Sequence, residues 1–411
     1  MGAEQRRVLT VLVISQVLGG AGMAAGITVG ALLAEDMLGS TGLAGLPSAL
    51  FTAGAALGAL AIGRLSQRSG RRPGLALGHA TAATGSLGVV VAAAAGSALL
   101  LFVSLFLYGA GSATSLLARY AGADLAPPER RGRAVSTVLL ATTFGAVAGP
   151  NLVGATGDVA HAWGIPRLAG PFLLAVAAYA SACVVLAVFL RPDPLLLARE
   201  REQVPDETVV VPVERGPGVV TGAAVMITGQ LVMVAIMTMT PVHMTGHGHS
   251  AQTAGLVISV HVAAMFLPSP LTGLLVDRLG PVRVAVASGL VLLSAGALAA
   301  LAPAHSVALL ATALALLGLG WNLGLVSGTA IVTEAVPLAA RATTQGTVDV
   351  GMAIAGSTGG MASGLVVAGS SYPALAAGGG LLALAILPVV GRQGRLLRTM
   401  RRHISGSPTK L

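Results

Sequence analysis

Residues 63–72 read GRLSQRSGRR, and residues 273–280 read GLLVDRLG, at an offset of 210 residues. The same offset superposes two further pairs of residues, Pro127 with Pro337 and Arg131 with Arg341. Two matches at one offset indicate that the chain is built from two parallel halves. The stretch 191–218 between them is rich in proline and charge, so we expect a loosely ordered linker there.

The composition indicates a protein that lies in lipid rather than in water. Of the 411 residues, 55% are hydrophobic and only 9% are charged, and the mean hydropathy is +0.85. Soluble domains carry roughly 25% charged residues, so this chain would expose too much apolar surface to water. The 56 glycines suit membrane helices, because small residues let helix backbones approach closely.

Apolar runs long enough to cross a bilayer recur along the whole chain, since a crossing helix needs about 20 residues. Twelve runs fall at roughly 8–33, 43–62, 74–96, 98–120, 134–156, 168–190, 219–243, 251–275, 283–302, 306–333, 343–367 and 373–390. The first follows Arg6 and Arg7 as in a signal peptide, but its length favours a membrane helix. We predict an all-α integral membrane protein with twelve transmembrane helices in two six-helix pseudo-symmetric bundles.

Basic residues gather in alternate loops and in the C-terminal tail. These segments carry Arg64, Arg68, Arg71, Arg72, Arg130, Arg131, Arg133, Arg191, Arg199, Arg201, Arg215, Arg278, Arg283, Arg341, Arg392, Arg395, Arg398, Arg401, Arg402 and Lys410. The opposite loops hold essentially Arg167 alone, so the positive-inside rule places both termini in the cytoplasm. The net charge of +9 then indicates contact with anionic lipid and not with nucleic acid, since the chain has no basic and aromatic stripe.

The span pattern also predicts the domain organisation. The expected parts are an N-terminal six-helix bundle at 1–190, a cytoplasmic linker at 191–218, a C-terminal six-helix bundle at 219–391 and a basic cytoplasmic tail at 392–411.

Twelve spans, duplicated halves and a G-x-L-x-x-R-x-G-R-R loop after the second span resemble the major facilitator superfamily. The resemblance implies two halves that rock about a site at the membrane midplane and give alternating access. It also implies gating and structural roles for Gly63, Arg68, Gly70, Arg71, Asp277 and Arg278. Gln67 stands where the family has Asp, which leaves open how the inner gate of the first half is held.

Two pairs of soft donor residues lie on neighbouring predicted spans. Met233 with Met237 and His261 with Met265 are each spaced i, i+4, so each pair shares one helix face. Counted inward from the outer ends of the two spans, their depths agree to within about one turn. Thioether sulfur and imidazole suit Cu(I) better than Mg, Ca or Mn. The pairs therefore predict a copper site near the middle of the membrane, with a His bonded to a backbone carbonyl as the structural alternative.

Further His and Met residues near the outer end of the seventh span are accessory candidates. They are His243, Met244, His247 and His249, together with Gln230 one turn before Met233. A His and Met loop at the mouth of a transporter can collect metal, but three exposed His can equally be incidental.

The M-x-x-x-M pair followed by H-x-x-x-M on the seventh and eighth spans resembles the CcoA-like copper importers. Those proteins supply copper for the assembly of cbb3-type cytochrome oxidase in bacteria. The resemblance implies that Met233, Met237, His261 and Met265 are the copper ligands. It also implies a monomer in the bacterial inner membrane, with copper as substrate rather than cofactor and copper chaperones as partners.

Other polar residues within the spans allow more than one interpretation. Asp349 on the eleventh span is a candidate carrier of a coupling proton, and the alternative is a pair with Arg341 two turns away. We expect Arg119 and Asp124 to form a helix-terminal pair and His79 to be structural.

One feature favours a different transported substrate. Residues 145–154, GAVAGPNLVG on the fifth span, resemble the Gly and Pro motif of proton-coupled drug exporters, which makes drug or small-solute efflux the alternative function. Efflux predicts an aromatic pocket, yet only 3% of the residues are aromatic. An enzyme is not expected, because the sequence shows no Ser-His-Asp arrangement and no HExxH motif.

Overall fold

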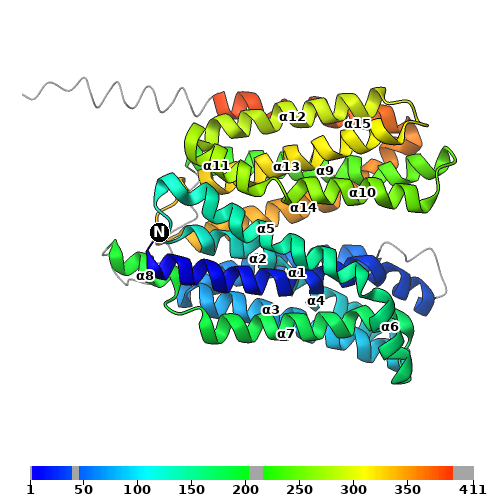
Figure 1. Cartoon of the computed structure of the whole chain (residues 1–411), viewed down its shortest axis with the longest axis horizontal. Helices are drawn as coiled ribbons and strands as arrows, with labels where there is room; N and C mark the ends of the chain where they lie inside the picture. Colours follow the sequence, from blue (N-terminus) through cyan, green and yellow to red (C-terminus); the bar gives the residue numbers. More distant parts are fainter. Residues whose placement is uncertain (1, 39–45, 203–215, 392–411) are drawn as a thin grey trace, which may run out of the picture. The chain divides into compact units, whose positions relative to one another are not determined.

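The structure, a computed structural model, describes residues 2–38, 46–202 and 216–391, which form helices joined by turns and contain no β-strand. The first half contains α1 (Ala3–Leu38), α2 (Leu46–Ser69), α3 (Arg71–Ala95), α4 (Ala98–Ala123), α5 (Arg131–Asn151), α6 (Val153–Ala162), α7 (Gly170–Phe189) and α8 (Pro194–Arg201). The second half contains α9 (Pro217–Gly246), α10 (Ala251–Phe266), α11 (Ser269–Leu279), α12 (Pro281–Leu301), α13 (Val307–Ala335), α14 (Arg341–Gly369) and α15 (Tyr372–Ala383). The predicted all-helical architecture is confirmed (Figure 1).

Each of the twelve predicted spans coincides with one helix or with two consecutive helices. Among the described residues, ten helical segments are long and apolar enough to cross a membrane. Three spans are broken: the fifth between α5 and α6, the eighth between α10 and α11, and the twelfth at the turn 384–385 after α15. The second break lies beside Pro268, which has no N–H with which to continue the helical hydrogen bonds.

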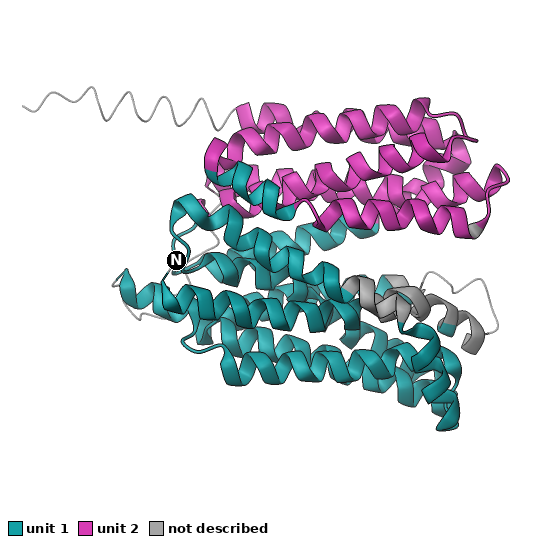
Figure 2. Ribbon diagram, in the orientation of Figure 1, with its two compact units in different colours: residues 1–214, 269–277, 336–357 teal, residues 215–268, 278–335, 358–411 magenta. Residues whose placement is uncertain are grey.

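Contacts divide the chain into two compact units (Figure 2). Unit 1 comprises residues 1–214, 269–277 and 336–357, and unit 2 comprises residues 215–268, 278–335 and 358–411. Unit 1 therefore contains most of α11 and the first part of α14, although both helices belong to the second half of the sequence.

Unit 1 is built on close packing between α3 and α4, with α1 and α7 against them. Leu12 of α1 and Leu117 of α4 are fully or almost fully buried in one apolar cluster, and Tyr108 lies in a second. A Cβ at Gly111 of α4 would overlap the backbone of Ala82 on α3, so only glycine permits this approach.

Helix α13 lies at the centre of unit 2, where it contacts α9, α10 and α12. Every residue of α13 from 320 to 333 is buried. At Gly318, an added Cβ would lie 2.6 Å from the carbonyl oxygen of His261, so α10 and α13 touch backbone to backbone. The hydroxyl of Ser288 on α12 donates to the carbonyl of Gly320 at 2.7 Å.

The second of the repeated loops holds the start of a helix from the other half of the sequence. Asp277 Oδ1 accepts a hydrogen bond from the backbone N–H of Gly132 at 2.8 Å. Its other oxygen pairs with Nε of Arg133 at 2.7 Å. Because Gly132 lies in the first turn of α5, the carboxylate also meets the positive end of the helix dipole.

The first repeated loop makes the equivalent contact with a neutral side chain. Gln67 Oε1 accepts from the backbone N–H of Ala342 at 2.7 Å, and Ala342 corresponds to Gly132 at the offset of 210 residues. The Gln67 amide group also donates to the carbonyls of Leu338 and Ala339. Gln67 thus replaces the family's Asp with a group that accepts from the start of α14 and donates to the turn before it.

The expectation of a loosely ordered linker at 191–218 is wrong for its described part. Helix α8 forms there, and its cap residue Asp193 accepts hydrogen bonds from the backbone N–H of Leu195 at 3.0 Å and of Arg72 at 2.7 Å. Leu195 is fully buried, so the segment packs on unit 1 instead of remaining loose. Residues 203–215 and the basic tail 392–411 lie outside the described residues.

The backbone approach at Gly318 generates a stability prediction. Gly318→Ala should destabilise the protein by about 1–3 kcal/mol, because the new methyl group has to push α10 away from α13. Gly378→Ala is the matched control, since Gly378 is a helical glycine with nothing within 4 Å of an added Cβ. Thermal unfolding in detergent should show a lowered midpoint for Gly318→Ala alone. Equal midpoints for the two variants would contradict this account of the packing.

Candidate functional site

The methionine pair on α9 lies in the interior of unit 2. Met233 is buried, with 4% of its surface exposed, and Met237 is half-buried. Gln230 shares their helix face, because residues at i, i+3 and i+7 align on an α-helix. Its Oε1 accepts a hydrogen bond from the indole N–H of Trp321 on α13 at 2.7 Å. The face of α9 that carries both thioethers therefore turns toward α13.

The imidazole of His261 is fully buried between α10 and α13. Its Nδ1 lies 2.8 Å from the carbonyl oxygen of Leu314. Because a carbonyl only accepts, Nδ1 must carry the proton, and in the neutral ring Nε2 then presents a lone pair. Nε2 is buried and has no hydrogen-bond partner among the described residues. The backbone-bonded alternative is therefore present, and it leaves the second nitrogen available as a ligand.

Met265 lies one turn after His261 and is 9% exposed. Its backbone carbonyl accepts a hydrogen bond from the side-chain amide of Asn322 on α13 at 2.7 Å. This bond fixes α10 against α13 at the level of Met265.

Trp321 sets the register between α9 and α10. Its ring meets Phe266 of α10 edge to face, with centroids 5.8 Å apart, while its N–H bonds Gln230 of α9. Gln230 and Phe266 thus lie at one level, and the two antiparallel helices contact each other (Figure 1). The four predicted ligands lie one to seven residues from that level, toward the end of α9 and the start of α10, which is about 1.5 to 10.5 Å along the helices. They therefore fall within about two turns of one another along these helices.

The histidines at the C-terminal end of α9 do not converge on one point. His243 stacks on Tyr372 with centroids 4.4 Å apart, and its ring also lies 4.4 Å from that of His247. His249 Nε2 instead lies 2.9 Å from the carbonyl of Ala304. Met244 is fully buried. Among the described residues, no group of three or more His, Cys, Asp or Glu side chains is placed to hold a metal ion.

Asp349 forms a buried ion pair that the sequence did not indicate. Its carboxylate accepts two hydrogen bonds from the guanidinium of Arg119, at 2.7 and 3.1 Å. The Tyr120 hydroxyl donates a third, at 3.3 Å. The side chains of Arg119 and Asp349 are 0% and 4% exposed, so no solvent screens the pair. The alternative pairing of Asp349 with Arg341 is wrong, because the Arg341 guanidinium donates to the carbonyl of Val336.

The expected pair between Arg119 and Asp124 is also wrong. Asp124 pairs with Arg71 at 2.7 Å, and Arg71 donates a further hydrogen bond to Gln345 at 2.5 Å. Gln345 and Asp349 are one turn apart on α14, so α14 binds one arginine from α3 and one from α4 with the same face. Spacing could not reveal these pairs, since Arg119 and Asp349 lie 230 residues apart.

The other motif residues divide into buried and exposed groups. Arg71 is 1% exposed, whereas Arg68 and Arg278 are exposed. A Cβ on Gly63 would lie 2.9 Å from the carbonyl of Ala342, so α2 and α14 approach closely there. Gly70 adopts a φ of 95° at the start of α3, a conformation that favours glycine.

His79, for which the sequence predicts a structural role, is a buried polar residue. It is fully buried, and neither ring nitrogen has a hydrogen-bond partner among the described residues. Its ring lies 5.6 Å from that of Tyr179, and a Cβ on Gly19 would lie 3.0 Å from it. No neighbouring residue in the sequence signals this environment.

Comparisons with known proteins identify the family. The Major Facilitator Superfamily model matches residues 11–265 and 221–395. The Bacillus subtilis protein named Uncharacterized MFS-type transporter YdeG is 56% identical over 392 residues, which cover 94% of this chain and 91% of the relative. The riboflavin transporter RfnT of Brucella anthropi is 33% identical over 352 residues, which cover 84% and 85%.

Among solved structures, the human organic anion transporter MFSD10 aligns with a TM-score of 0.78 at 17% identity, over 95% of this chain and 100% of that one. This likeness shows the shared fold. The superfamily consists in general of transporters and not of enzymes. Family match, relatives and helical architecture agree, and the chain therefore belongs to the Major Facilitator Superfamily, as a multi-pass membrane protein and secondary transporter.

Proposed function

We propose that this transporter carries copper into the bacterial cell, with Met233, Met237, His261 and Met265 as ligands of the moving ion. The observation that carries the proposal is the hydrogen bonding of the two ring nitrogens of His261. Its Nδ1–H is fixed by a carbonyl, and its buried Nε2 has a lone pair without a partner among the described residues. Metal-binding histidines usually have this arrangement, in which one nitrogen donates to a carbonyl and the other binds the metal.

The surrounding donors suit a soft ion that must also leave. Thioether sulfur and neutral imidazole favour Cu(I) over hard cations. None of the four groups is a thiolate, so the site binds copper without the tight grip of a Cys-based sequestration site. Met233 is buried, and its face of α9 turns toward α13, the helix that also holds His261.

The cellular setting follows from the same proposal. Arginine-rich loops favour an orientation with both termini in the cytoplasm of a bacterial inner membrane. Imported copper would pass to chaperones for cytochrome oxidase assembly, and a single chain supplies all four ligands. Met244 and the neighbouring rings of His243 and His247, which lie at a tilt to one another, provide further soft donors near the outer end of α9.

Alternating access in this proposal is coupled to a proton on Asp349. The carboxylate joins α14 to Arg119 of α4 by two hydrogen bonds in a buried setting. Protonation would remove the charge of Asp349 and with it the ion pair that offsets the buried charge of Arg119, which is strongly unfavourable while α4 and α14 stay together. Proton uptake would therefore favour separation of α14 from α4.

Riboflavin is a second candidate substrate, because RfnT is 33% identical over most of both chains. A flavin needs a flat aromatic contact and hydrogen-bonding amides. Trp321, Phe266 and Gln230 supply these groups within unit 2, at the level that also carries Met265. The two substrates would thus use overlapping parts of the same unit.

The copper proposal predicts that two conservative variants lose radiocopper uptake by cells. Met233→Leu keeps the side-chain volume but removes the sulfur. His261→Asn keeps a donor for the Leu314 carbonyl but removes the Nε2 lone pair. Each should reduce uptake by at least about tenfold, since a lost metal ligand or its support costs 10–100-fold.

Met239→Leu is the matched control, because Met239 is a half-buried methionine on α9 outside the proposed ligand set. It should transport normally, and immunoblots of membranes should show equal amounts of all three variants. Wild-type copper uptake by both Met233→Leu and His261→Asn would rule out the copper site.

The riboflavin candidate predicts a different set of sensitive residues. If the flavin is carried, Trp321→Leu should abolish uptake of radiolabelled riboflavin, because it removes both the aromatic face and the bond to Gln230. Met233→Leu should leave riboflavin uptake intact. The absence of any riboflavin uptake in cells that express the wild-type protein would exclude this substrate.

The proton proposal predicts that Asp349→Asn transports slowly and no longer responds to collapse of the proton gradient, since the amide cannot carry the proton. Asp124→Asn is the control, because it disrupts the neighbouring buried pair with Arg71 but leaves Asp349 in place. It should keep the wild-type response to a protonophore. A normal protonophore response in Asp349→Asn would show that the proton travels elsewhere.

A further inference from the structure

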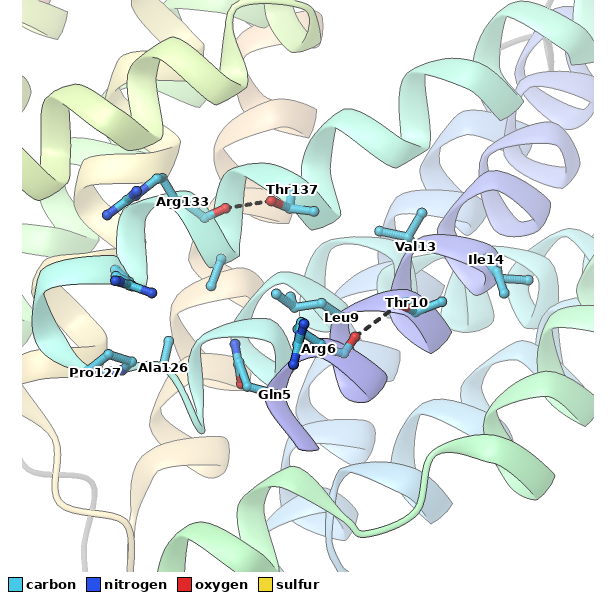
Figure 3. Close-up of a pocket in the computed structure, with 12 residues that line it drawn as sticks. Gln5, Arg6, Leu9, Thr10, Val13, Ile14, Ala126, Pro127, Arg133 and Thr137 are labelled. Carbon is cyan, nitrogen blue, oxygen red and sulfur yellow. Dashed lines mark hydrogen bonds between the residues drawn. The ribbon is translucent and has the colours of Figure 1, made fainter. Parts of the chain in front are cut away.

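A cavity of about 420 Å³ lies between the start of α1 and the start of α5, entirely within unit 1 (Figure 3). Its α1 wall carries Arg6, Thr10 and Val13, which share one helix face at i, i+4 and i+7. Its other wall carries Arg130, from the turn before α5, and Arg133. The cavity therefore brings three guanidinium-bearing residues from separate parts of the chain around one space.

The positive charge in this cavity is not balanced by ion pairs among the described residues. Arg133 pairs with Asp277, but neither Arg6 nor Arg130 has an ion pair within the described part of the chain. No acidic side chain lines the cavity. The Thr10 hydroxyl and the Gln5 side-chain amide already donate to the carbonyls of Arg6 and Gly122. The guanidinium groups of Arg6 and Arg130 therefore supply the donors of a recognition site for an anion with several acceptor oxygens.

The far side of the same cavity is apolar. Leu9, Val13 and Ile14 line it, and Ile14 is 46% exposed on a helix whose length and composition suit a membrane span. A charged end and an apolar end in one cavity match the headgroup and the acyl chains of a phospholipid. A free phosphate ion would leave the apolar end of the cavity without a matching group. Basic cavities between membrane helices are known binding places for anionic headgroups.

We propose that this cavity is a binding site for an anionic phospholipid. The phosphate lies between Arg6 and Arg130, and one acyl chain follows Val13 and Ile14 along α1. Because Arg133 lines the same cavity and pairs with Asp277, the lipid phosphate lies next to the contact that holds α11 to α5.

Native mass spectrometry of the delipidated full-length protein tests the site with phosphatidylglycerol as probe. Arg6→Gln combined with Arg130→Gln should lower its affinity by roughly tenfold or more. Arg7→Gln combined with Arg64→Gln is the matched control, since both arginines are exposed, bear the same charge and do not line the cavity. The control should bind phosphatidylglycerol as the wild type does. Unfolding midpoints of the lipid-free proteins should be equal, because all four arginines are exposed.

Two further probes distinguish the source of the phosphate. Phosphatidylcholine with the same acyl chains should bind at least about tenfold more weakly than phosphatidylglycerol, and glycerol 3-phosphate should not compete at equal concentration. Equal affinity for the two lipids, equal losses in both double variants, or full competition by glycerol 3-phosphate would overturn the proposal.

Discussion

Lipid offers no hydrogen bonds, and this constraint explains most of the polar contacts in the protein. Each buried donor or acceptor has to find its partner within the helices. Arg119 and Asp349 satisfy one another so completely that both side chains are almost without exposed surface. Arg71, Asp124 and Gln345 form a second set on the same principle. The helices that carry these groups are therefore held in specific positions by charge as well as by packing.

The same constraint makes a buried group without a hydrogen-bond partner informative. An imidazole nitrogen that is exposed to water accepts a hydrogen bond from solvent, so its lack of a protein partner costs little free energy. In the interior of unit 2, the unpaired Nε2 of His261 costs free energy, and a site that keeps such a cost commonly has a use for it. Two further observations support the hypothesis of a binding site at His261. Met233 is buried, and Trp321 contacts both α9 and α10 at one level along the helices. The similarity to a riboflavin transporter is the reason why riboflavin is the second candidate substrate.

The helices could be predicted well from the sequence, because a helix that crosses lipid requires a long run of apolar residues. An apolar run of about 20 residues has essentially one stable form in a bilayer. The depth of Met233 and His261 in the membrane stays a prediction, since it is only a count of residues along a helix. Prediction from the sequence failed on Arg119 and Asp124, where the nearest opposite charge in sequence was taken as the partner. The true partners lie on α14 and α3, and only three-dimensional packing brings them together.

Gln67 and Asp277 each accept a hydrogen bond from the first turn of an equivalent helix, but the Gln67 side chain is neutral and the Asp277 side chain is charged. The Asp277 contact joins full charges, with Arg133 half exposed, so dissolved ions screen it. The Gln67 contact joins only dipoles, and its amide has no proton to gain or lose near neutrality. The duplicated architecture thus contains one helix-start contact that weakens as the ionic strength around the loop rises and one that does not depend on it. A rise in the salt concentration around these loops would therefore loosen the two repeats unequally.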